Sequence, residues 1–367
     1  MSEFNDPTVT TAWDGFKREE DILLEDVLLE EEDFSYSDNK DNHYDVESTD
    51  RASKLAKYSD QIGNFAAKYD NIVSSVDGVG TKILLAQYAR LAYNRPLNSI
   101  GQDAVAMVVN DLLCRGAKPL FFLDYFASNK IPHDQFYEIL EGIHLACKSI
   151  NIPLIGGETA SLPGIIIENS FDVAGFGVGR IECKDDELPR DIKRDDVVIG
   201  IKSSGFHSNG FTLIRKNIGW RESGNQEFLN KLLEPTKIYV NDIMKIEDIC
   251  KNKLLAPKKI KGLAHITGGG FDNIQKILPK NMIVKYTDRI LYERPYLAHE
   301  DLFEWIQERE TFTMDQMYAT FNCGIGMVAI LNPEDAETLE RTSANYVKKN
   351  IVKLGTIQRS LIKNNSL

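Results

Sequence analysis

Residues 103–127 read DAVAMVVNDLLCRGAKPLFFLDYFA, and this stretch decides the fold class. Its first half has apolar residues at helical spacing and ends at Gly116 and Pro119, two residues that commonly terminate helices. Its second half is a short apolar and aromatic run typical of a buried strand. A helix followed at once by a strand predicts packed α/β layers.

The same alternation continues on both sides of this stretch. Strands are predicted over 71–80, 152–159, 171–182, 196–204 and 323–331, and helices over 135–150, after Gly210 and after the glycine loop 268–270. The charged stretch 182–196 is predicted to connect two α/β halves of similar size. We therefore expect an N-terminal domain over 44–181 and a C-terminal domain over 182–367.

The composition is that of a globular protein. The chain has 367 residues, 43% of them hydrophobic, which suits about two domains. No apolar run approaches the roughly 18–20 residues needed to span a bilayer, and the acidic start does not resemble a signal peptide. The five cysteines are scattered and form no C-x-x-C pair, so we expect reduced thiols in a cytoplasmic protein.

The negative charge is concentrated at one end of the chain. Residues 1–50 carry a balance of −14, while the whole chain carries −12, so the remainder is nearly neutral. No basic cluster favours nucleic acid. Residues 1–43 are interpreted as a flexible acidic extension; the alternative is an amphipathic helix over 21–34 that docks through Leu24, Val27 and Leu28.

Asp77, Asp103, Asn110 and Asp111 form the first candidate site. On a helix, positions 103, 110 and 111 fall within about a quarter-turn of one another, while Val105, Val108, Val109 and Leu112 can face a sheet. Carboxylate and amide oxygens from a helix and a strand end suit a magnesium ion that bridges nucleotide phosphates. The alternative is a solvated acidic helix face.

The run VDGVGTK (76–82) is the second candidate, because glycines let backbone N–H groups approach phosphate. Its alternative is an ordinary tight turn. The third candidate is the pair of loops SSGFHSNG (203–210) and HITGGGF (265–271), whose composition suits a phosphate or sugar grip. His207 is a candidate for proton transfer near neutral pH, although a lone histidine in a turn is more often a simple hydrogen-bonding residue.

At these residues the chain closely resembles the AIR synthetase (phosphoribosylformylglycinamidine cyclo-ligase) family. Eight segments match in family order: VSSVDGVGTKILLA (73–86), IGQDAVAMVVNDLLCRGAKPLFFLDYFA (100–127), IPLIGGETASLPG (152–164), DVAGFGVG (172–179), SSGFHSNGFTLIRK (203–216), LLEPTKIYV (232–240), AHITGGGFDNI (264–274) and MYATFNCGIGMV (317–328). The resemblance implies a two-domain α/β fold whose first domain forms a barrel across a homodimer. It also implies an enzyme of purine biosynthesis that uses ATP to close the imidazole ring of aminoimidazole ribonucleotide.

The resemblance assigns roles residue by residue. Catalytic roles fall to His207 and Asp103, and magnesium ligation to Asp77, Asn110 and Asp111. ATP contacts are implied for Lys57, Asp77, Gly78, Gly80, Thr81, Lys82, Asn110, Asp111 and Glu158. The formylglycinamidine ribonucleotide is assigned to Ser203, Ser204, Gly205, Ser208, Asn209, Thr267, Gly268, Gly269 and Gly270.

Two features depart from the family pattern. The glycine-rich stretch before the first core strand is shortened to DQIGNFAAKYDN (60–71), and the acidic extension is unusual. One alternative is another ATP-using member of the superfamily, of the selenophosphate synthetase, thiamine-phosphate kinase or hydrogenase-maturation type. Another is a nucleotide-binding regulator without turnover. The chain has neither the N-terminal reactive cysteine expected of the selenophosphate enzyme nor the C-terminal cysteine of the maturation factor.

Overall fold

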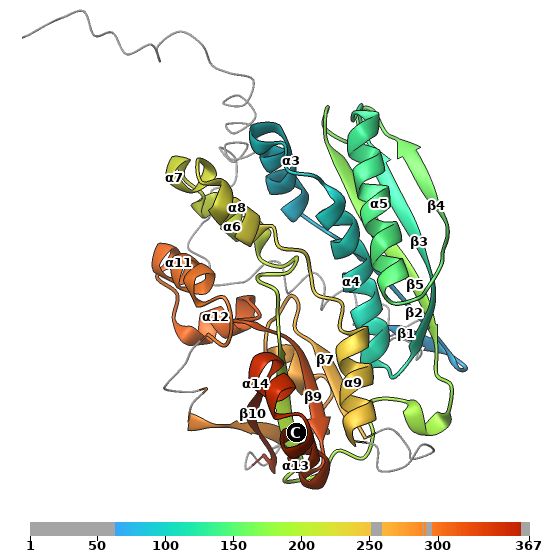
Figure 1. The fold of residues 1–367 in the computed structure, drawn as a ribbon, viewed down its shortest axis with the longest axis vertical. Coiled ribbons are helices and arrows are strands. Elements are labelled where there is room, and N and C mark those ends of the chain that lie inside the picture. The colour runs from blue at the N-terminus through green and yellow to red at the C-terminus, as the bar shows by residue number, and fades with distance from the viewer. Residues whose placement is uncertain (1–62, 251–258, 289, 291–295, 361–367) are drawn as a thin grey trace, which may run out of the picture.

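A computed structural model describes residues 63–250, 259–288, 290 and 296–360. Two five-stranded sheets organise this part of the chain, with strand orders β1-β2-β5-β3-β4 and β7-β9-β6-β10-β8. Figure 1 shows the first sheet beside α4 and α5 and the second beside α9, α13 and α14. The predicted two-part α/β architecture is confirmed.

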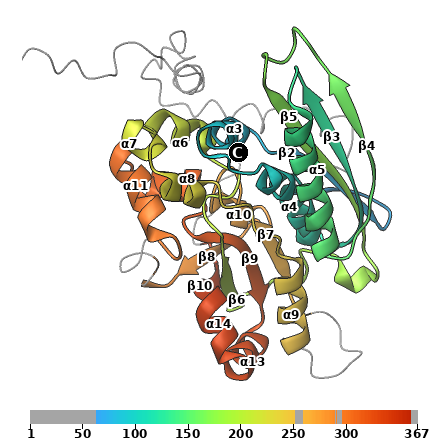
Figure 2. The same cartoon turned by 45° about the horizontal axis from the view of Figure 1, so that its top comes forward.

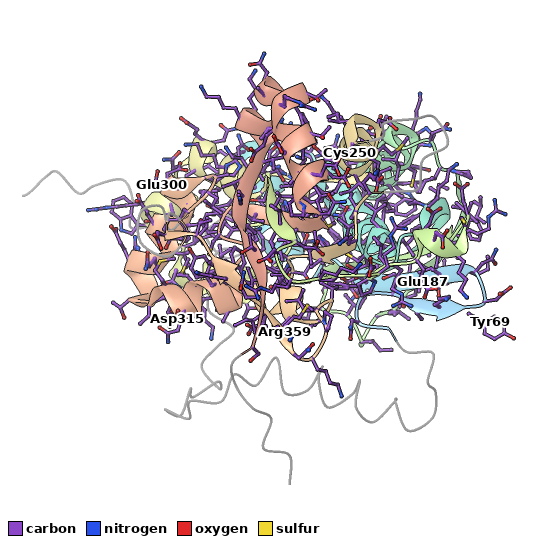
Figure 3. All side chains as sticks on the ribbon, turned by 90° about the horizontal axis from the view of Figure 1, so that it is seen from below. Tyr69, Glu187, Cys250, Glu300, Asp315 and Arg359 are labelled. Atoms are coloured by element: carbon purple, nitrogen blue, oxygen red, sulfur yellow. The ribbon has the colours of Figure 1, made fainter. Side chains whose placement is uncertain are left out.

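The first sheet and its helices account for residues up to the connector. Its strands are β1 (Ala67–Tyr69), β2 (Ile72–Gly78), β3 (Lys118–Ser128), β4 (Leu154–Ser161) and β5 (Phe171–Arg180), and its helices are α3 (Lys82–Tyr93), α4 (Asn98–Cys114) and α5 (His133–Ser149). β3 pairs with β4 in parallel, whereas the other pairs are antiparallel. Figure 3 shows Tyr69 at the outer tip of the β1–β2 ribbon, where it is 78% exposed.

The second half is antiparallel throughout its ladder. Its strands are β6 (Val197–Lys202), β7 (Gly262–His265), β8 (Met282–Tyr286), β9 (Ile325–Leu331) and β10 (Ile351–Arg359). Its helices are α6 (Phe211–Asn217), α7 (Trp220–Ser223), α8 (Gln226–Leu232), α9 (Val240–Cys250), α10 (Asp272–Gln275), α11 (Glu300–Glu310), α12 (Met314–Thr320), α13 (Pro333–Thr342) and α14 (Ala344–Asn350), and a short 3-10 helix, η1 (Lys184–Asp186), lies in the connector.

Strand β5 shows why α4 packs closely on the first sheet. Its residues alternate strictly, with Val173, Gly175, Gly177 and Gly179 buried beneath the helices. A Cβ atom at Gly177 would lie 2.5 Å from Val108 Cγ1, so only glycine leaves room for the valine-rich face of α4. The prediction that Val105, Val108, Val109 and Leu112 face a sheet is confirmed, since all four are fully buried.

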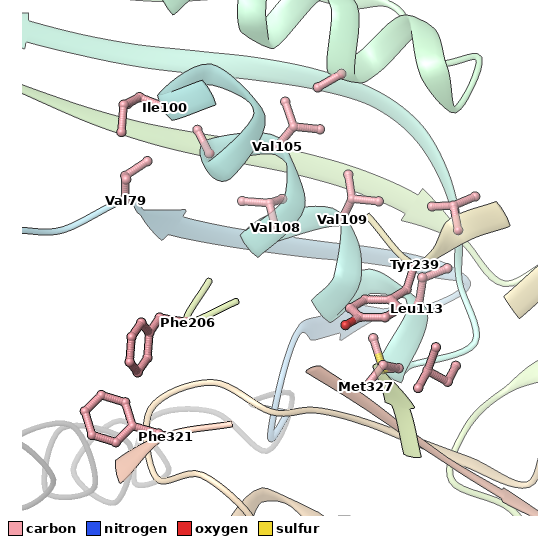
Figure 4. Packing of buried hydrophobic residues seen from close by; sticks show 14 of the residues in the cluster. Val79, Ile100, Val105, Val108, Val109, Leu113, Phe206, Tyr239, Phe321 and Met327 are labelled. Carbon is pink, nitrogen blue, oxygen red and sulfur yellow. The ribbon is translucent and has the colours of Figure 1, made fainter. Parts of the chain in front are cut away.

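One hydrophobic cluster runs through both halves. It joins Val105 and Val109 of α4 to Tyr239, Phe206 and Met327 of the second half, as Figure 4 shows. This continuous core fixes the two sheets relative to each other, because close-packed interiors tolerate little displacement. The region between them is therefore a defined site.

Several elements differ from the sequence prediction. The run after VDGVGTK is the helix α3, which begins at Lys82 and was not predicted, and β1, β7, β8 and β10 were also missed. The helix predicted after the glycine loop is present as α10, with four residues. The predicted extension and the helical pattern over 21–34 lie outside the described residues. Within the described ranges, no helix is long and apolar enough to cross a membrane.

Candidate active site

Helix α4 lies where the two halves of the molecule meet. Its apolar side faces the first sheet, and its polar side faces the chain between α8 and α9, which runs along it in Figure 1. Three of the four acidic and amide candidates, Asp103, Asn110 and Asp111, belong to this polar side. The structure thus brings them together, but it gives each a different neighbourhood.

Asp103 is fully buried and paired with a buried lysine. The Nζ atom of Lys82 lies 2.9 Å from Asp103 Oδ2 and 3.0 Å from Oδ1, and it also donates to the carbonyl of Glu234 at 2.8 Å. Burial lowers the pKa of Lys82, and the Asp103 carboxylate opposes this effect. The sequence placed Lys82 beside the nucleotide, whereas the structure turns its ammonium into the core.

Asn110 is also fully buried, and its amide binds backbone. Nδ2 donates to the carbonyl of Lys237 at 2.9 Å, and Oδ1 accepts from the N–H of Tyr239 at 3.0 Å. Nδ2 additionally lies 3.3 Å from His265 Nε2. Both amide atoms are therefore engaged inside the protein, which leaves Asn110 poorly placed to ligate an ion.

Asp111 and Asp77 form the less buried end of the acidic set. Asp111 Oδ1 lies 2.9 Å from His265 Nδ1, and the aspartate side chain keeps 16% of its surface exposed. Asp77 comes from the end of β2. Burial, followed by repulsion from Asp111, raises the pKa of Asp77 to about 6, although the N–H of Gly78 donates to its Oδ1 at 2.8 Å. Two neighbouring carboxylates that resist ionisation are suited to a cation.

The donor chemistry at Asp77 and Asp111 fits magnesium, which prefers carboxylate oxygens and retains ligands from water or phosphate. Among the described residues, no group of three or more His, Cys, Asp or Glu side chains is arranged to hold a metal ion by itself. A nucleotide-bound ion does not need such a group, because the phosphate oxygens supply part of its shell.

The glycine turn lies beside these carboxylates and opens into α3. Gly80 has φ +74°, a left-handed conformation that favours glycine, and a Cβ atom there would meet nothing within 4 Å. Thr81 follows, and its hydroxyl lies 3.1 Å from that of Thr212. Gly80 therefore borders open space just before the N-terminus of α3, a placement compatible with phosphate.

The loop 203–210 belongs to the second half and contacts the segment 235–236 that lies along α4. His207, at φ +63°, is fully buried, and its Nε2 accepts from the N–H of Ser204 at 3.2 Å. Burial, and then nearby positive groups, lower the pKa of His207 well below its ordinary value. A Cβ atom at Gly326 would lie 2.2 Å from His207 Cε1, so the ring fills a slot shaped for it.

The second loop, 267–270, lies next to the first. Gly269 and Gly270 both have positive φ, and a Cβ atom at Gly270 would lie 1.8 Å from the Tyr318 carbonyl oxygen. The nearest atom to a Cβ atom at Gly268 would be Asn209 Oδ1, at 3.8 Å. The buried Nδ2 of Asn209 has no hydrogen-bond partner among the described residues. Thr267, which opens this loop, directly follows the β7 strand and Ile266.

The remaining predicted residues are Glu158, which lies apart from this cluster, Lys57, Ser203 and Gly205. Glu158 on β4 is exposed and pairs in register with Tyr125, so it occupies the face of the first sheet that α4 does not cover. Lys57 lies outside the described residues. Ser203 and Gly205 are held by Asn322, which accepts from Ser203 Oγ at 3.2 Å and donates to the Gly205 carbonyl at 2.9 Å.

The sequence prediction missed the segment 233–239 and His265. Thr236 is fully buried and donates to Asp103 Oδ1 from both N and Oγ1, each at 2.6 Å. The motif LLEPTKIYV matches the family, but its contacts could not be predicted from the sequence, because an irregular segment has no periodicity that shows which residues face the protein. His265 precedes the TGGG run, so its position in the motif was the available signal.

Fold and site together define a class: two-domain α/β proteins with an acidic, glycine-flanked site where the domains meet. Family models of this class match the chain, "AIR synthase related protein, N-terminal domain" over residues 62–181 and "AIR synthase related protein, C-terminal domain" over 193–360. The chain belongs to the AIR synthase family, and the resemblance read from its motifs is confirmed.

Individual relatives agree. The chain is 42% identical to a phosphoribosylformylglycinamidine cyclo-ligase of Alkaliphilus metalliredigens, over 72% of this chain and 74% of that protein. It is 40% identical to the enzyme of the same name from Chromobacterium violaceum, over 75% and 79%. A solved hydrogenase maturation protein HypE in complex with ATP matches with a TM-score of 0.52 and 16% identity, over 88% of each chain, which supports the fold alone.

Proposed function

We propose that this chain catalyses the ATP-dependent ring closure of formylglycinamidine ribonucleotide to aminoimidazole ribonucleotide, with release of ADP and phosphate. The observation that carries the proposal is the convergence on α4. Asp111 binds His265, which leads into the TGGG loop, and Asp103 binds Thr236, which contacts Ser208. Residues matching the family's ATP positions and its substrate loops thus share one hydrogen-bond network.

In this reaction the formyl oxygen attacks the γ-phosphorus of ATP, and ADP leaves. The amidine nitrogen then attacks the formyl carbon and the ring closes. The former formyl oxygen departs with the phosphate. The protein's task is to position two phosphorylated ligands and to compensate charge as one phosphoryl group moves. The glycine turn 78–80 with Thr81 binds phosphate, while loops 203–210 and 267–270 bind the ribonucleotide.

Asp77 and Asp111 would hold the magnesium ion that accompanies ATP. When bound, magnesium neutralises phosphate charge and orients the transferred group. Asn110 is not among the ligands, since both of its amide atoms bind the protein backbone. Asn110 instead positions Asp111 on the helix by anchoring α4 to residues 237 and 239.

Three buried residues hold the protein chain that surrounds the site: Asp103, Lys82 and His207. Asp103 and Lys82 contact each other and the segment 234–236 with no exposed surface. His207 uses Nε2 to hold the backbone of Ser204. Nδ1 of His207 has no hydrogen-bond partner among the described residues. Because a neutral, buried imidazole whose Nε2 already accepts a hydrogen bond is a poor proton shuttle, we assign His207 the orienting role rather than the acid/base role.

The decisive experiment measures ADP release with and without formylglycinamidine ribonucleotide. The cyclo-ligase requires that substrate for ADP release and forms aminoimidazole ribonucleotide in equal amount. ATP consumption that responds instead to thiamine phosphate or selenide would identify another superfamily activity. ATP binding without turnover under any of these conditions would favour the regulator.

The same proposal includes a homodimer built on the open face of the first sheet. Register places Val76, Phe176 and Leu123 in one row of that face, and Val76 and Phe176 are 70% and 41% exposed. Exposed apolar surface of this kind suits a protein interface. Glu158 lies on this face, so its contribution to an ATP site would be made across the dimer.

Sedimentation tests the dimer directly. Phe176→Glu would place a charge in the proposed interface, and we expect it to shift the protein from dimer to monomer with loss of turnover. Trp220→Glu is the matched control, because Trp220 is 75% exposed but lies on α7, away from this sheet. A wild-type monomer at micromolar concentration with full activity would contradict this part of the proposal.

A further inference from the structure

The chain between α8 and α9 is held almost entirely by side chains. Residues 234–239 have no regular secondary structure, yet five successive carbonyl oxygens, 233 to 237, each accept a hydrogen bond from a side chain. The donors are, in order, Arg95, Lys82, Ser204, Gln102 and Asn110. Four of them belong to the first half and one to the loop 203–210. The segment therefore couples α4 to that loop.

The direction of the hydrogen bonds at Thr236 is determined by chemistry. Its backbone N–H can only donate, and it donates to Asp103 Oδ1 at 2.6 Å, so that oxygen is an acceptor. Thr236 Oγ1 lies 2.6 Å from the same oxygen. Two oxygens so close need a proton between them, and only the threonine hydroxyl supplies one. The single hydroxyl proton of Thr236 is thus committed to Asp103.

This commitment fixes the next link. Thr236 Oγ1 and Ser208 Oγ are 2.9 Å apart, and this distance alone would permit either hydroxyl to be the donor. Since the proton of Thr236 already points to Asp103, Ser208 must donate to Thr236. The Ser208 hydroxyl then has only lone pairs left for any other partner.

The other serines of the loop are oriented the same way. Ser204 Oγ donates to the carbonyl of Pro235 at 2.6 Å, and a carbonyl can only accept. Ser203 Oγ donates to Asn322 Oδ1, whose amide orientation is set because Nδ2 donates to the Gly205 carbonyl. Ser203 is buried, whereas Ser204 and Ser208 are half-exposed. Two accessible hydroxyls therefore present acceptors to the ligand.

We infer that Ser208, together with Ser204, recognises an N–H or O–H donor of the substrate rather than a phosphate oxygen, and that Thr236 is the positioning residue that sets this direction. A phosphate dianion offers acceptors only, so it needs donors and would repel the lone pairs of these hydroxyls. The amide, amidine and ribose groups of the ribonucleotide all carry suitable donors. The inference rests on the proposed function for the identity of that substrate.

Steady-state kinetics with a phosphate probe test the inference. We expect Ser208→Ala to raise KM for formylglycinamidine ribonucleotide by about tenfold, as expected for one lost hydrogen bond of about 1.4 kcal/mol. The Ki of inorganic phosphate, measured as a competitor of formylglycinamidine ribonucleotide, should not change. A parallel loss of phosphate affinity would show that Ser208 donates to phosphate and would overturn the inference.

Thr236 should act through Ser208. Thr236→Val should raise the same KM by about three- to tenfold in the wild-type background and have little further effect on KM when Ser208 is alanine. Thr236→Ser keeps a hydroxyl and should restore most of the wild-type KM. Thr356→Val on β10, a half-exposed threonine remote from both loops, is the matched control. Additive effects of the two substitutions on KM would exclude Thr236 as the orienting residue.

A stability cycle separates this inference from the proposed function. Unfolding of Thr236→Val, Ser208→Ala and the double variant is measured without any ligand, and the two changes should be non-additive because the hydroxyls are in direct contact. Additive midpoint shifts would overturn the network. Failure of wild-type ADP release would instead overturn the proposed function and leave the cycle interpretable.

Discussion

The two ends of α4 place a carboxylate in opposite environments. At one end, Asp103 is fully buried and surrounded by donors, from Lys82 and from the backbone and hydroxyl of Thr236. At the other, Asp111 keeps part of its surface exposed and faces Asp77, another carboxylate. The first environment satisfies a charge within the protein, whereas the second leaves charge that favours an external cation.

This difference separates structural residues from ligand-binding ones within one motif. Family resemblance groups Asp103, Asn110 and Asp111 together, and helical spacing places them on one side of α4. Their hydrogen-bond partners distinguish them. An aspartate paired with a buried cation, as Asp103 is with Lys82, stabilises the fold, and one placed beside another carboxylate is available for function. The following predictions test this contrast, beginning with the largest effect.

Removing the buried cation should be the most damaging change. Lys82→Met leaves the Asp103 charge buried without its counter-ion, and we expect the free energy of unfolding to fall by about 3–5 kcal/mol. Denaturant unfolding monitored by circular dichroism measures it. Lys130→Met is the control, because its ion pair with Glu168 is 76% and 61% exposed and should contribute less than about 1 kcal/mol. Equal losses in the free energy of unfolding for the two substitutions would contradict the structural role of the buried Lys82–Asp103 pair.

Asp111→Asn should impair the nucleotide side while the fold persists. We expect kcat/KM for ATP to fall by about tenfold to a hundredfold, as for the loss of a charge-assisted interaction of about 1.5–3 kcal/mol. The magnesium concentration required for half-maximal rate should rise. Glu308→Gln, on the exposed side of α11, should change neither quantity. Unchanged kinetics at limiting magnesium would remove Asp111 from the site.

Asp77→Asn should stabilise the ligand-free protein and weaken its activity. The pKa of Asp77 is raised to about 6 in the folded state, so the folded protein holds a proton that the unfolded chain releases near its ordinary value of 3.8. The wild type therefore loses stability as the pH rises from about 4 to about 6, and the loss persists above that range. The asparagine variant avoids this loss.

The expected gain for Asp77→Asn is a Tm higher by several degrees at pH 7–8, since 1 kcal/mol shifts Tm by about 2–4 °C in domains of 150–250 residues. The gain should shrink as the pH falls towards 4. Saturating magnesium and ATP should also reduce it, because they stabilise the wild-type carboxylate. A variant less stable than the wild type at pH 8 without ligand would contradict the like-charge interpretation.

Changes at His207 should be the mildest if it orients the loop. His207→Asn can still accept from the Ser204 N–H, so we expect kcat within about fivefold of the wild type. His207→Ala should lose more through KM than through kcat. If both variants lowered kcat by about a hundredfold or more, proton transfer by His207 would be the better explanation.

The sequence by itself determined the fold class, the family and the chemical types gathered at the site. Periodicity identified α4 and the strands β2, β3, β4, β5, β6 and β9, because local spacing shows which side of an element is apolar. The two glycine-containing loops were found because glycine composition marks close backbone approach. These features depend on residues near one another in the chain.

Only the tertiary structure decided which of those residues face a ligand. Lys82 and Asp103 are 21 positions apart, and both meet the segment at 234–236, more than 130 positions from Asp103. Burial and hydrogen-bond direction depend on such distant partners, which no local pattern encodes. The same sequence letters therefore give a satisfied charge at Asp103 and an unsatisfied one at Asp77, because the free energy of an ionised group is set by its surroundings in space.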